Sequence, residues 1–360
     1  MPASADWVLG IDSGGSGVRV AVARADGTEV SAPAVSARPA VTGERGIDAA
    51  SLLDQVVPLV NGLLDKAGAG TLAAACVGAA GMATLGTDLR AVLPDALAAA
   101  FGVESLALAG DAVTAYAGAL GLRPGVVVAA GTGVIALGTA ADGRGWLRAD
   151  GWGHLLGDAG GGSWIGRAGL DAAMRAHDGR AGGSTALLAR AEDRFGPLDG
   201  MPARLYPRPD RPAVLASFAP DVAACATGGD PVASGILRAA ATHILESAAA
   251  VRPDAAAVDV ALTGGLFKMG EPLLGPLRER AGRMLPDARL VPAAGDPLDG
   301  ALLIAGALHR DALPLPADPA LLRLVSRAAP ARSRTAPVRS GADAARSGTA
   351  QTRSMTERER

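Results

Sequence analysis

The chain has 360 residues, of which 49% are apolar, and its formal net charge is -2 at pH 7. This length is enough for two domains with a large core, and the apolar content argues against wholesale disorder. The balanced charge, without a basic stripe, argues against a nucleic-acid partner. The two cysteines, Cys76 and Cys225, lie far apart and outside any C-x-x-C pair, so we expect buried free thiols rather than a disulfide framework or a zinc cluster.

The first predicted element is a strand over 7–11. The residues before it carry no positively charged region of the kind that begins a signal peptide. No segment reaches the length of a membrane span without Gly, Pro or charged residues. We therefore expect a cytoplasmic protein with no membrane partner.

Strands and helices are expected to alternate along the rest of the chain, which is typical of layered α/β domains. A helix over 48–66 has an apolar face that is interrupted only by Pro58. The other expected elements are strands at 72–78, 105–109 and 258–263, and helices at 111–120, 163–177, 231–251, 271–284 and 298–309.

An internal repeat organises the chain. The segment from Gly10 to Gly27 contains a strand, a Gly-rich turn, a second strand and an Asp-Gly hairpin signal, and the segment from 126 to 143 repeats this order. Gly15-Ser16-Gly17-Val18 returns as Gly131-Thr132-Gly133-Val134 in the same register. A repeated unit at this spacing predicts two domains of related fold.

The composition changes near residue 311. The segment 317–360 is rich in Pro, Ala, Ser, Thr and Arg and contains no Phe, Tyr or Trp. Such a segment buries too little apolar area to order itself, so we expect residues 311–360 to form a mostly disordered, solvated tail.

The two Gly-rich turns are candidate phosphate sites. Neither has the Lys-Ser/Thr of a Walker A loop, and the first joins strand to strand, unlike a Rossmann turn. Glycines allow the backbone to approach a phosphate, and the two hydroxyl groups add donors. The candidates are Gly14, Gly15, Ser16, Gly131, Thr132 and Gly133. Asp12, at the end of the first strand, is placed to hold Mg²⁺ through water.

Asp111 follows an apolar strand and opens a helix. This position is typical of a helix cap and also of catalytic groups in α/β folds. A kinase that phosphorylates a hydroxyl group needs a carboxylate to orient that hydroxyl and accept its proton.

Glycines are densest between residues 151 and 166. Gly151 allows close approach of a ligand, Trp152 is suited to pack against a sugar, and Asp158 is suited to accept hydroxyl hydrogen bonds. Further along, Gly264 and Gly265 end a strand, where a flat ring could lie on the backbone.

Together these motifs resemble the N-acetylglucosamine kinase group of the BadF/BadG/BcrA/BcrD-type ATPases, within the actin/hexokinase/Hsp70 superfamily. The resemblance covers residues 8–309, and its most specific element is Gly151-Trp152-Gly153-His154-Leu155-Leu156-Gly157-Asp158 with Trp164-Ile165-Gly166. It implies two actin-like (ribonuclease H-like) domains around a central cleft. We expect domains at 1–120 and 121–296, with the final helix at 297–310 packed back on the first domain.

The resemblance also implies roles for single residues. Asp111 matches the catalytic base, and Asp12 matches the aspartate that serves Mg²⁺. Gly264 and Gly265 match the adenosine site. The family's phosphate turns correspond here to Gly15, Ser16, Gly131 and Thr132, and its sugar-hydroxyl contacts correspond to Gly151 and Asp158. We add Gly14 and Gly133 to the residues expected to bind phosphate. We add Trp152 and Thr132 to the residues expected to bind the sugar.

Three departures from the family pattern bear on the substrate. The family has an acidic residue where this chain has Ala159, a polar residue where it has Val134, and an Asn near the segment that begins at Val41. We expect an ATP- and Mg²⁺-dependent kinase of an amino sugar, N-acetylglucosamine or glucosamine. Whether the protein forms a homodimer is left open. The alternatives are an ATPase or a nucleotide-gated sensor without sugar turnover; an activator with an iron–sulfur cluster and a ROK-type protein both need cysteine motifs that are absent here.

Overall fold

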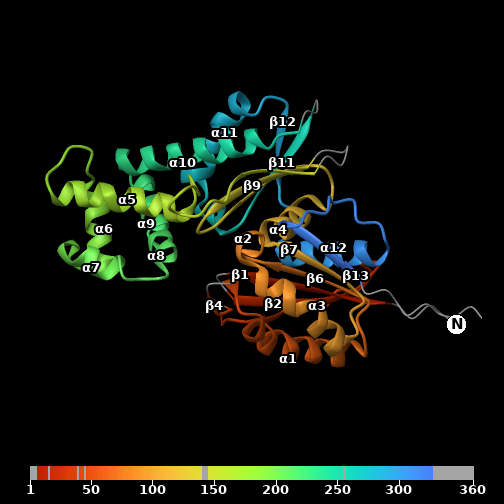
Figure 1. The fold of residues 1–360 in the computed structure, drawn as a ribbon. Helices are drawn as coiled ribbons and strands as arrows, with labels where there is room; N and C mark the ends of the chain where they lie inside the picture. The colour runs from red at the N-terminus through yellow and green to blue at the C-terminus, as the bar shows by residue number, and fades with distance from the viewer. Residues whose placement is uncertain are drawn as a thin grey trace, which may run out of the picture. The chain divides into compact units, whose positions relative to one another are not determined.

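The computed structural model describes residues 6–14, 17–38, 40–43, 46–139, 145–253 and 257–326. Two mixed β-sheets with helices packed on them make up this part of the chain (Figure 1). The prediction of an α/β fold is therefore confirmed.

The first sheet has the strand order β3-β2-β1-β6-β7-β13. The strands β1, β2 and β3 are antiparallel neighbours, whereas β6 runs parallel to both β1 and β7. Its members are β1 (Trp7–Gly14), β2 (Gly17–Arg24), β3 (Ala34–Ser36), β6 (Ala74–Ala79), β7 (Ser105–Gly110) and β13 (Leu322–Ser326).

The second sheet repeats this arrangement in the order β10-β9-β8-β11-β12. Its first three strands are antiparallel neighbours, and β11 runs parallel to both β8 and β12. The strands are β8 (Gly125–Ala130), β9 (Val134–Thr139), β10 (Trp146–Asp150), β11 (Val258–Thr263) and β12 (Ala288–Pro292). The repeated sequence segments thus form equivalent hairpins, β1–β2 and β8–β9. The Asp142-Gly143 signal of the second copy lies outside the described residues.

Helices cover both faces of the first sheet. On one face, α1 (Ala49–Ala67) and α3 (Thr87–Phe101) supply leucines and valines to a core with β1, β2 and β6. Asp48 caps α1 by accepting a hydrogen bond from the amide of Ser51 (2.7 Å), and the helix continues through Pro58. The short elements α2 (Met82–Leu85), β4 (Thr42–Gly43) and β5 (Gly46–Ile47) complete this half.

The opposite face packs against α4 (Asp111–Leu120) and α12 (Pro297–His309). These two helices cross without side chains between their backbones. A Cβ atom on Gly300 would lie 1.9 Å from the carbonyl oxygen of Thr114, and one on Gly118 would lie 2.0 Å from that of Asp296. The crossing therefore requires glycine at both positions.

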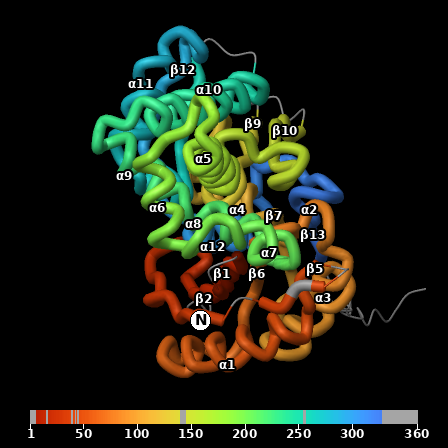
Figure 2. The backbone as a smooth tube through the Cα atoms, turned by 90° about the vertical axis from the view of Figure 1, so that its left-hand side faces the viewer, coloured from red at the N-terminus to blue at the C-terminus, as the bar shows by residue number. Residues whose placement is uncertain are grey.

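The remaining helices form the second large core with one face of the second sheet. Figure 2 shows α5, α6, α8 and α9 gathered together, with α10 beside α11. Their bounds are α5 (Gly162–His177), α6 (Thr185–Phe195), α7 (Met201–Leu205), α8 (Arg211–Ser217), α9 (Ala219–Thr227), α10 (Pro231–Ala250) and α11 (Glu271–Met284), with 3-10 helices η1 (Leu198–Gly200) and η2 (Gly265–Met269).

The predicted start of the tail at residue 311 is wrong. The described segment 311–326 is folded, and Leu322–Ser326 pair as β13 with β7. The amide of Gly110 donates to the carbonyl of Leu321 (2.9 Å), and Arg90 donates to that of Ala320 (3.1 Å). The strand contains alternating apolar residues within a segment rich in Pro and Ala. The average composition of that segment hid this short pattern. The rest of the predicted tail lies outside the described residues.

Candidate active site

A cavity of about 730 Å³ gathers most of the predicted site residues. It lies where β1, β7, β8 and β11 end, as expected for ligand sites at the carboxyl ends of parallel strands. Its lining includes Asp12, Gly14, Asp111, Gly131, Thr132, Gly133, Gly151, Asp158, Gly264 and Gly265. Gly15 and Ser16 lie outside the described residues.

Asp12 forms an ion pair at the end of the first hairpin. Nη2 of Arg19 lies 2.7 Å from its Oδ2, and Nε lies 3.0 Å from the same oxygen. Nη1 of Arg19 reaches Asp296, 2.6 Å away, where that carboxylate caps α12. Burial raises the pKa of Asp12, and the guanidinium of Arg19 opposes this rise. Arg19 therefore favours the ionised form of a carboxyl group that burial disfavours.

Asp111 is the first residue of α4 and faces the cavity. Its Oδ1 accepts a hydrogen bond from the amide of Ala112 (2.9 Å). Removal from bulk water in the cleft raises the pKa of this carboxyl group, and the negative charge of Asp12 adds to the rise. A carboxylate with a raised pKa is a stronger proton acceptor once it is ionised.

The surroundings of Asp12 fit a magnesium ion that keeps most of its water. Among the described residues no cluster of three or more His, Cys, Asp or Glu side chains could hold a metal by itself. Mg²⁺ in phosphate-transfer sites is commonly held by one or two carboxylates together with substrate phosphates. In the described hydrogen bonds, Arg19 engages Oδ2 of Asp12, which leaves Oδ1 for such a hydrated ion.

Asp158 lies where the second Gly-rich turn meets the glycine-dense segment. Its Oδ1 accepts a hydrogen bond from the amide of Gly153 (3.2 Å). A Cβ atom on Gly133 would lie 2.4 Å from Oδ2 of Asp158, so a larger residue at this position would displace the carboxylate. Burial raises the pKa of Asp158, and the nearby Asp150 contributes to the rise.

Trp152 does not line the cavity. Its side chain is exposed (64%), and the guanidinium of Arg148 lies 4.6 Å from the ring centre. Arg148 itself lines the cavity and donates to the carbonyl of Gly151 (2.6 Å). The tryptophan thus packs on an arginine in this structure, and its proposed sugar contact stays a prediction.

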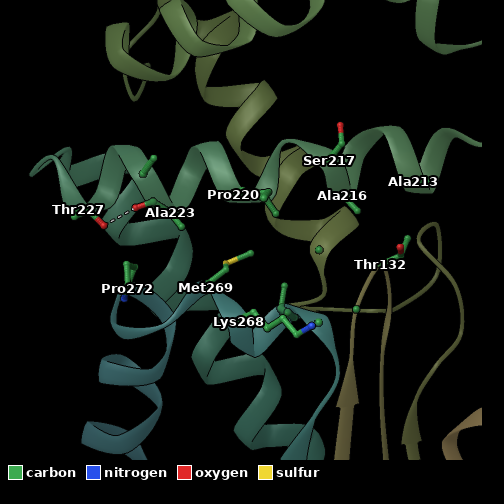
Figure 3. A pocket seen from close by; sticks show the side chains of 16 residues that line it. Thr132, Ala213, Ala216, Ser217, Pro220, Ala223, Thr227, Lys268, Met269 and Pro272 are labelled. Carbon is green, nitrogen blue, oxygen red and sulfur yellow. Dashed lines mark hydrogen bonds between the residues drawn. The ribbon is translucent and has the colours of Figure 1, made fainter. Parts of the chain in front are cut away.

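A second cavity, of about 750 Å³, adjoins the first (Figure 3). Figure 3 shows Lys268 and Met269 of η2 on one side and α8 and α9 on the other. Small side chains leave the space open, notably Ala213, Ala216, Ala223 and Pro220. The two cavities share the lining residues Gly131, Thr132, Ala213 and Gly265, so they lie side by side at the second Gly-rich turn.

Gly264 shapes the boundary between the cavities. Its φ is +103°, and a Cβ atom there would lie 2.2 Å from the carbonyl oxygen of Ala130. The strand β11 therefore turns sharply against the end of β8, which fits the predicted placement of Gly264 and Gly265 beside a flat ring.

Several residues of the site were not predicted from the sequence. Arg19 could have been found, because the register of a hairpin that turns between Gly14 and Gly17 places it opposite Asp12. The alanines of the second cavity gave no signal in a chain so rich in alanine. Asp296, Arg148 and Leu321 reach the site from distant parts of the chain or from a segment expected to be disordered.

No helix in the described ranges is both long and apolar enough to cross a membrane.

Comparison with protein families gives one match over most of the chain. The model of the BadF/BadG/BcrA/BcrD ATPase family matches residues 9–305. Among curated proteins, the N-acetylmuramic acid/N-acetylglucosamine kinase of Clostridium acetobutylicum is 26% identical over 305 residues, which cover 83% of this chain and 98% of the relative.

Solved structures show the same architecture. A candidate N-acetylglucosamine kinase from Chromobacterium violaceum is 30% identical, with a TM-score of 0.66, over 83% of this chain and 98% of that one. A ROK family glucokinase from Streptomyces griseus, solved with glucose and AMPPNP, is 19% identical, with a TM-score of 0.52, over 84% of this chain and 99% of that one. The second likeness concerns the fold alone. The predicted actin-like fold is confirmed.

Proposed function

Because the chain belongs to the BadF/BadG/BcrA/BcrD ATPase family, we propose that it is an ATP-dependent kinase that phosphorylates a hydroxyl group of an amino sugar. N-acetylglucosamine and glucosamine are the first candidate substrates, since the names of two similar proteins describe N-acetylglucosamine kinases.

The observation that carries the proposal is the pair of adjoining cavities, which share the lining residues Gly131, Thr132, Ala213 and Gly265. The second cavity has the apolar, small-residue lining that suits an adenine ring. The first is lined by four carboxylates, those of Asp12, Asp111, Asp158 and Asp210, which suits hydroxyl groups and a hydrated cation. A nucleotide with its base in the second cavity would present its phosphates to the shared residues Gly131, Thr132 and Gly265, and its terminal phosphoryl group to the first cavity.

The reaction follows from this placement. Asp111 orients the sugar hydroxyl and accepts its proton as the oxygen attacks the terminal phosphorus atom. A new P–O bond to the sugar forms while the bond to the bridging oxygen of ADP breaks. The amides of the two Gly-rich turns stabilise the charge on the transferring group. Mg²⁺, when bound near Asp12, would supply positive charge to the phosphates.

Asp158 is proposed to hold the sugar rather than to transfer protons. Its carboxylate lies beside Gly133, so a sugar bonded to it would place a hydroxyl group close to the phosphate turn. Holding the two reactants in line accounts for much of the acceleration that such enzymes achieve.

The test is ADP release with Mg²⁺ and ATP in the presence of N-acetylglucosamine, glucosamine, N-acetylmuramic acid, N-acetylmannosamine, glucose or no sugar. We expect one amino sugar to stimulate release strongly and Asp111→Asn to abolish the stimulation. ATP binding without stimulation by any sugar would reject the kinase proposal and favour an ATPase or a nucleotide-gated sensor.

A further inference from the structure

Asp150 is the last residue of β10, and both of its carboxylate oxygens are engaged by the backbone of the glycine-dense segment. Oδ1 accepts a hydrogen bond from the amide of Asp158 (2.5 Å), and Oδ2 accepts one from the amide of Ala159 (2.9 Å). One side chain thus holds two successive peptide groups beside the sugar-facing carboxylate.

The backbone around this contact is constrained. Asp150 and Asp158 both have positive φ, +61° and +55°, a conformation that few residues other than glycine adopt. A Cβ atom on Gly157 would lie 2.4 Å from Oδ1 of Asp150, so the loop is packed directly on the carboxylate. Left-handed residues persist where surrounding contacts fix them.

From Asp158 the hydrogen bonds continue to the second Gly-rich turn. Its carbonyl accepts from the amide of Gly161 (2.9 Å). The next amides, those of Gly162 and Ser163, donate to the carbonyls of Gly131 (2.9 Å) and Thr132 (2.8 Å). The turn assigned to phosphate is therefore held by the first residues of α5, which follow the peptide groups that Asp150 holds.

We propose that Asp150 is a positioning residue for the sugar site: its carboxylate fixes the peptide groups of Asp158 and Ala159, and so directs the Asp158 side chain at the sugar. The inference rests on the proposed kinase function for its ligand. It differs from a purely structural role because it predicts a defect on the sugar side of the reaction and little change on the nucleotide side.

The experiment compares Asp150→Asn and Asp150→Gly with Asp287→Asn. Asn and Gly both adopt positive φ, so these changes remove the carboxylate without backbone strain. Asn keeps one acceptor oxygen and Gly keeps none. Asp287 is a matched control, because it also has positive φ (+63°) and is exposed at a turn away from both cavities.

Two measurements are made on the full chain: KM for sugar and for ATP, and hydrogen exchange of the amides between residues 151 and 164. We expect KM for the sugar to rise by roughly tenfold in Asp150→Asn and by more in Asp150→Gly, with KM for ATP within about twofold of the unchanged protein. The amides of Asp158 and Ala159 should exchange faster in both variants and be unaffected in Asp287→Asn.

Unchanged exchange in Asp150→Gly would overturn the inference, because the carboxylate would then not hold the loop. Faster exchange with equal changes in both KM values would also overturn it, since the role would be structural only. If the unchanged protein turns over no sugar, the kinase proposal fails. Hydrogen exchange of the same amides is then measured with and without each sugar. If no sugar protects these amides, the inference about Asp150 is rejected as well.

Discussion

Arg19 and Asp12 face one another across the β1–β2 hairpin, with Nη2 of the arginine 2.7 Å from Oδ2 of the aspartate. The same guanidinium reaches Asp296 at the start of α12. One guanidinium therefore joins the carboxyl end of the first strand to the start of α12, which packs on one face of the first sheet. The side chain of Asp12 is only 15% exposed and that of Arg19 is 32% exposed, so loss of the pair should lower stability as well as activity.

Replacing Arg19 by Gln should destabilise the protein by about 2 kcal/mol, because it leaves the partly buried Asp12 without its positive partner. The measurement is the midpoint of urea unfolding at neutral pH. Arg175→Gln is the control: Arg175 pairs with Asp171 one helical turn away on an exposed surface, and such a pair contributes only a few tenths of a kcal/mol. Equal shifts in the two variants would contradict the argument.

Replacing Asp111 by Asn should lower turnover by about a hundredfold or more and leave nucleotide binding intact. Because burial and the charge of Asp12 raise the pKa of Asp111, the unchanged protein should lose kcat, as pH falls, at a higher pH than an ordinary aspartate would give. In the folded state a raised carboxyl pKa favours the neutral form, so ionisation costs stability as pH rises through that pKa. Asp111→Asn should therefore unfold at no lower temperature than the unchanged protein at pH 7. A variant that loses activity by unfolding would refute this assignment.

Gly133→Ala and Gly131→Ala should separate the two substrates. The new methyl group of the first would meet the Asp158 carboxylate, and we expect KM for the sugar to rise by roughly tenfold. The new methyl group of the second would have no protein atom within 4 Å apart from its chain neighbours, and Gly131 lines both cavities, at the position proposed for the phosphates. KM for ATP should rise there, with KM for the sugar little changed. The reverse pattern would mean that the two cavities have been assigned to the wrong ligands.

Ala223→Leu should weaken nucleotide binding by roughly tenfold, because the larger side chain takes up space in the second cavity. Displacement of a fluorescent ATP analogue measures it directly, without reliance on turnover. Ala250→Leu, at the exposed end of α10, introduces the same change away from the site and should bind normally. Unchanged binding in Ala223→Leu would place the base elsewhere.

Local sequence signals predicted the elements well. The apolar strands, the helix that opens at Asp111 and the two equivalent hairpins all follow from patterns within about twenty residues. Contacts between residues far apart in the sequence could not be predicted from such local patterns. The Arg19–Asp296 pair spans 277 positions, and nothing local distinguishes Asp296 from an ordinary helix cap.

The region proposed to hold the sugar was harder to predict from the sequence than the rest of the site. Asp150 looks like the polar end of a strand, and its role depends on the left-handed turn that brings the amides of Asp158 and Ala159 onto it. The composition of the segment after residue 311 pointed to disorder because composition averages over residues, whereas a single five-residue strand needs only one partner edge.

That strand has a practical consequence for where the chain can be shortened. If the protein ends just after α12, β7 becomes a sheet edge with unpaired amides and carbonyls, and such edges recruit other chains. The same cut removes Leu321, which lines the cavity and accepts the hydrogen bond from Gly110, the residue before Asp111. A shortened protein of this kind should therefore precipitate and lose activity together, whereas one that ends after Ser326 keeps both the edge and the wall of the cavity.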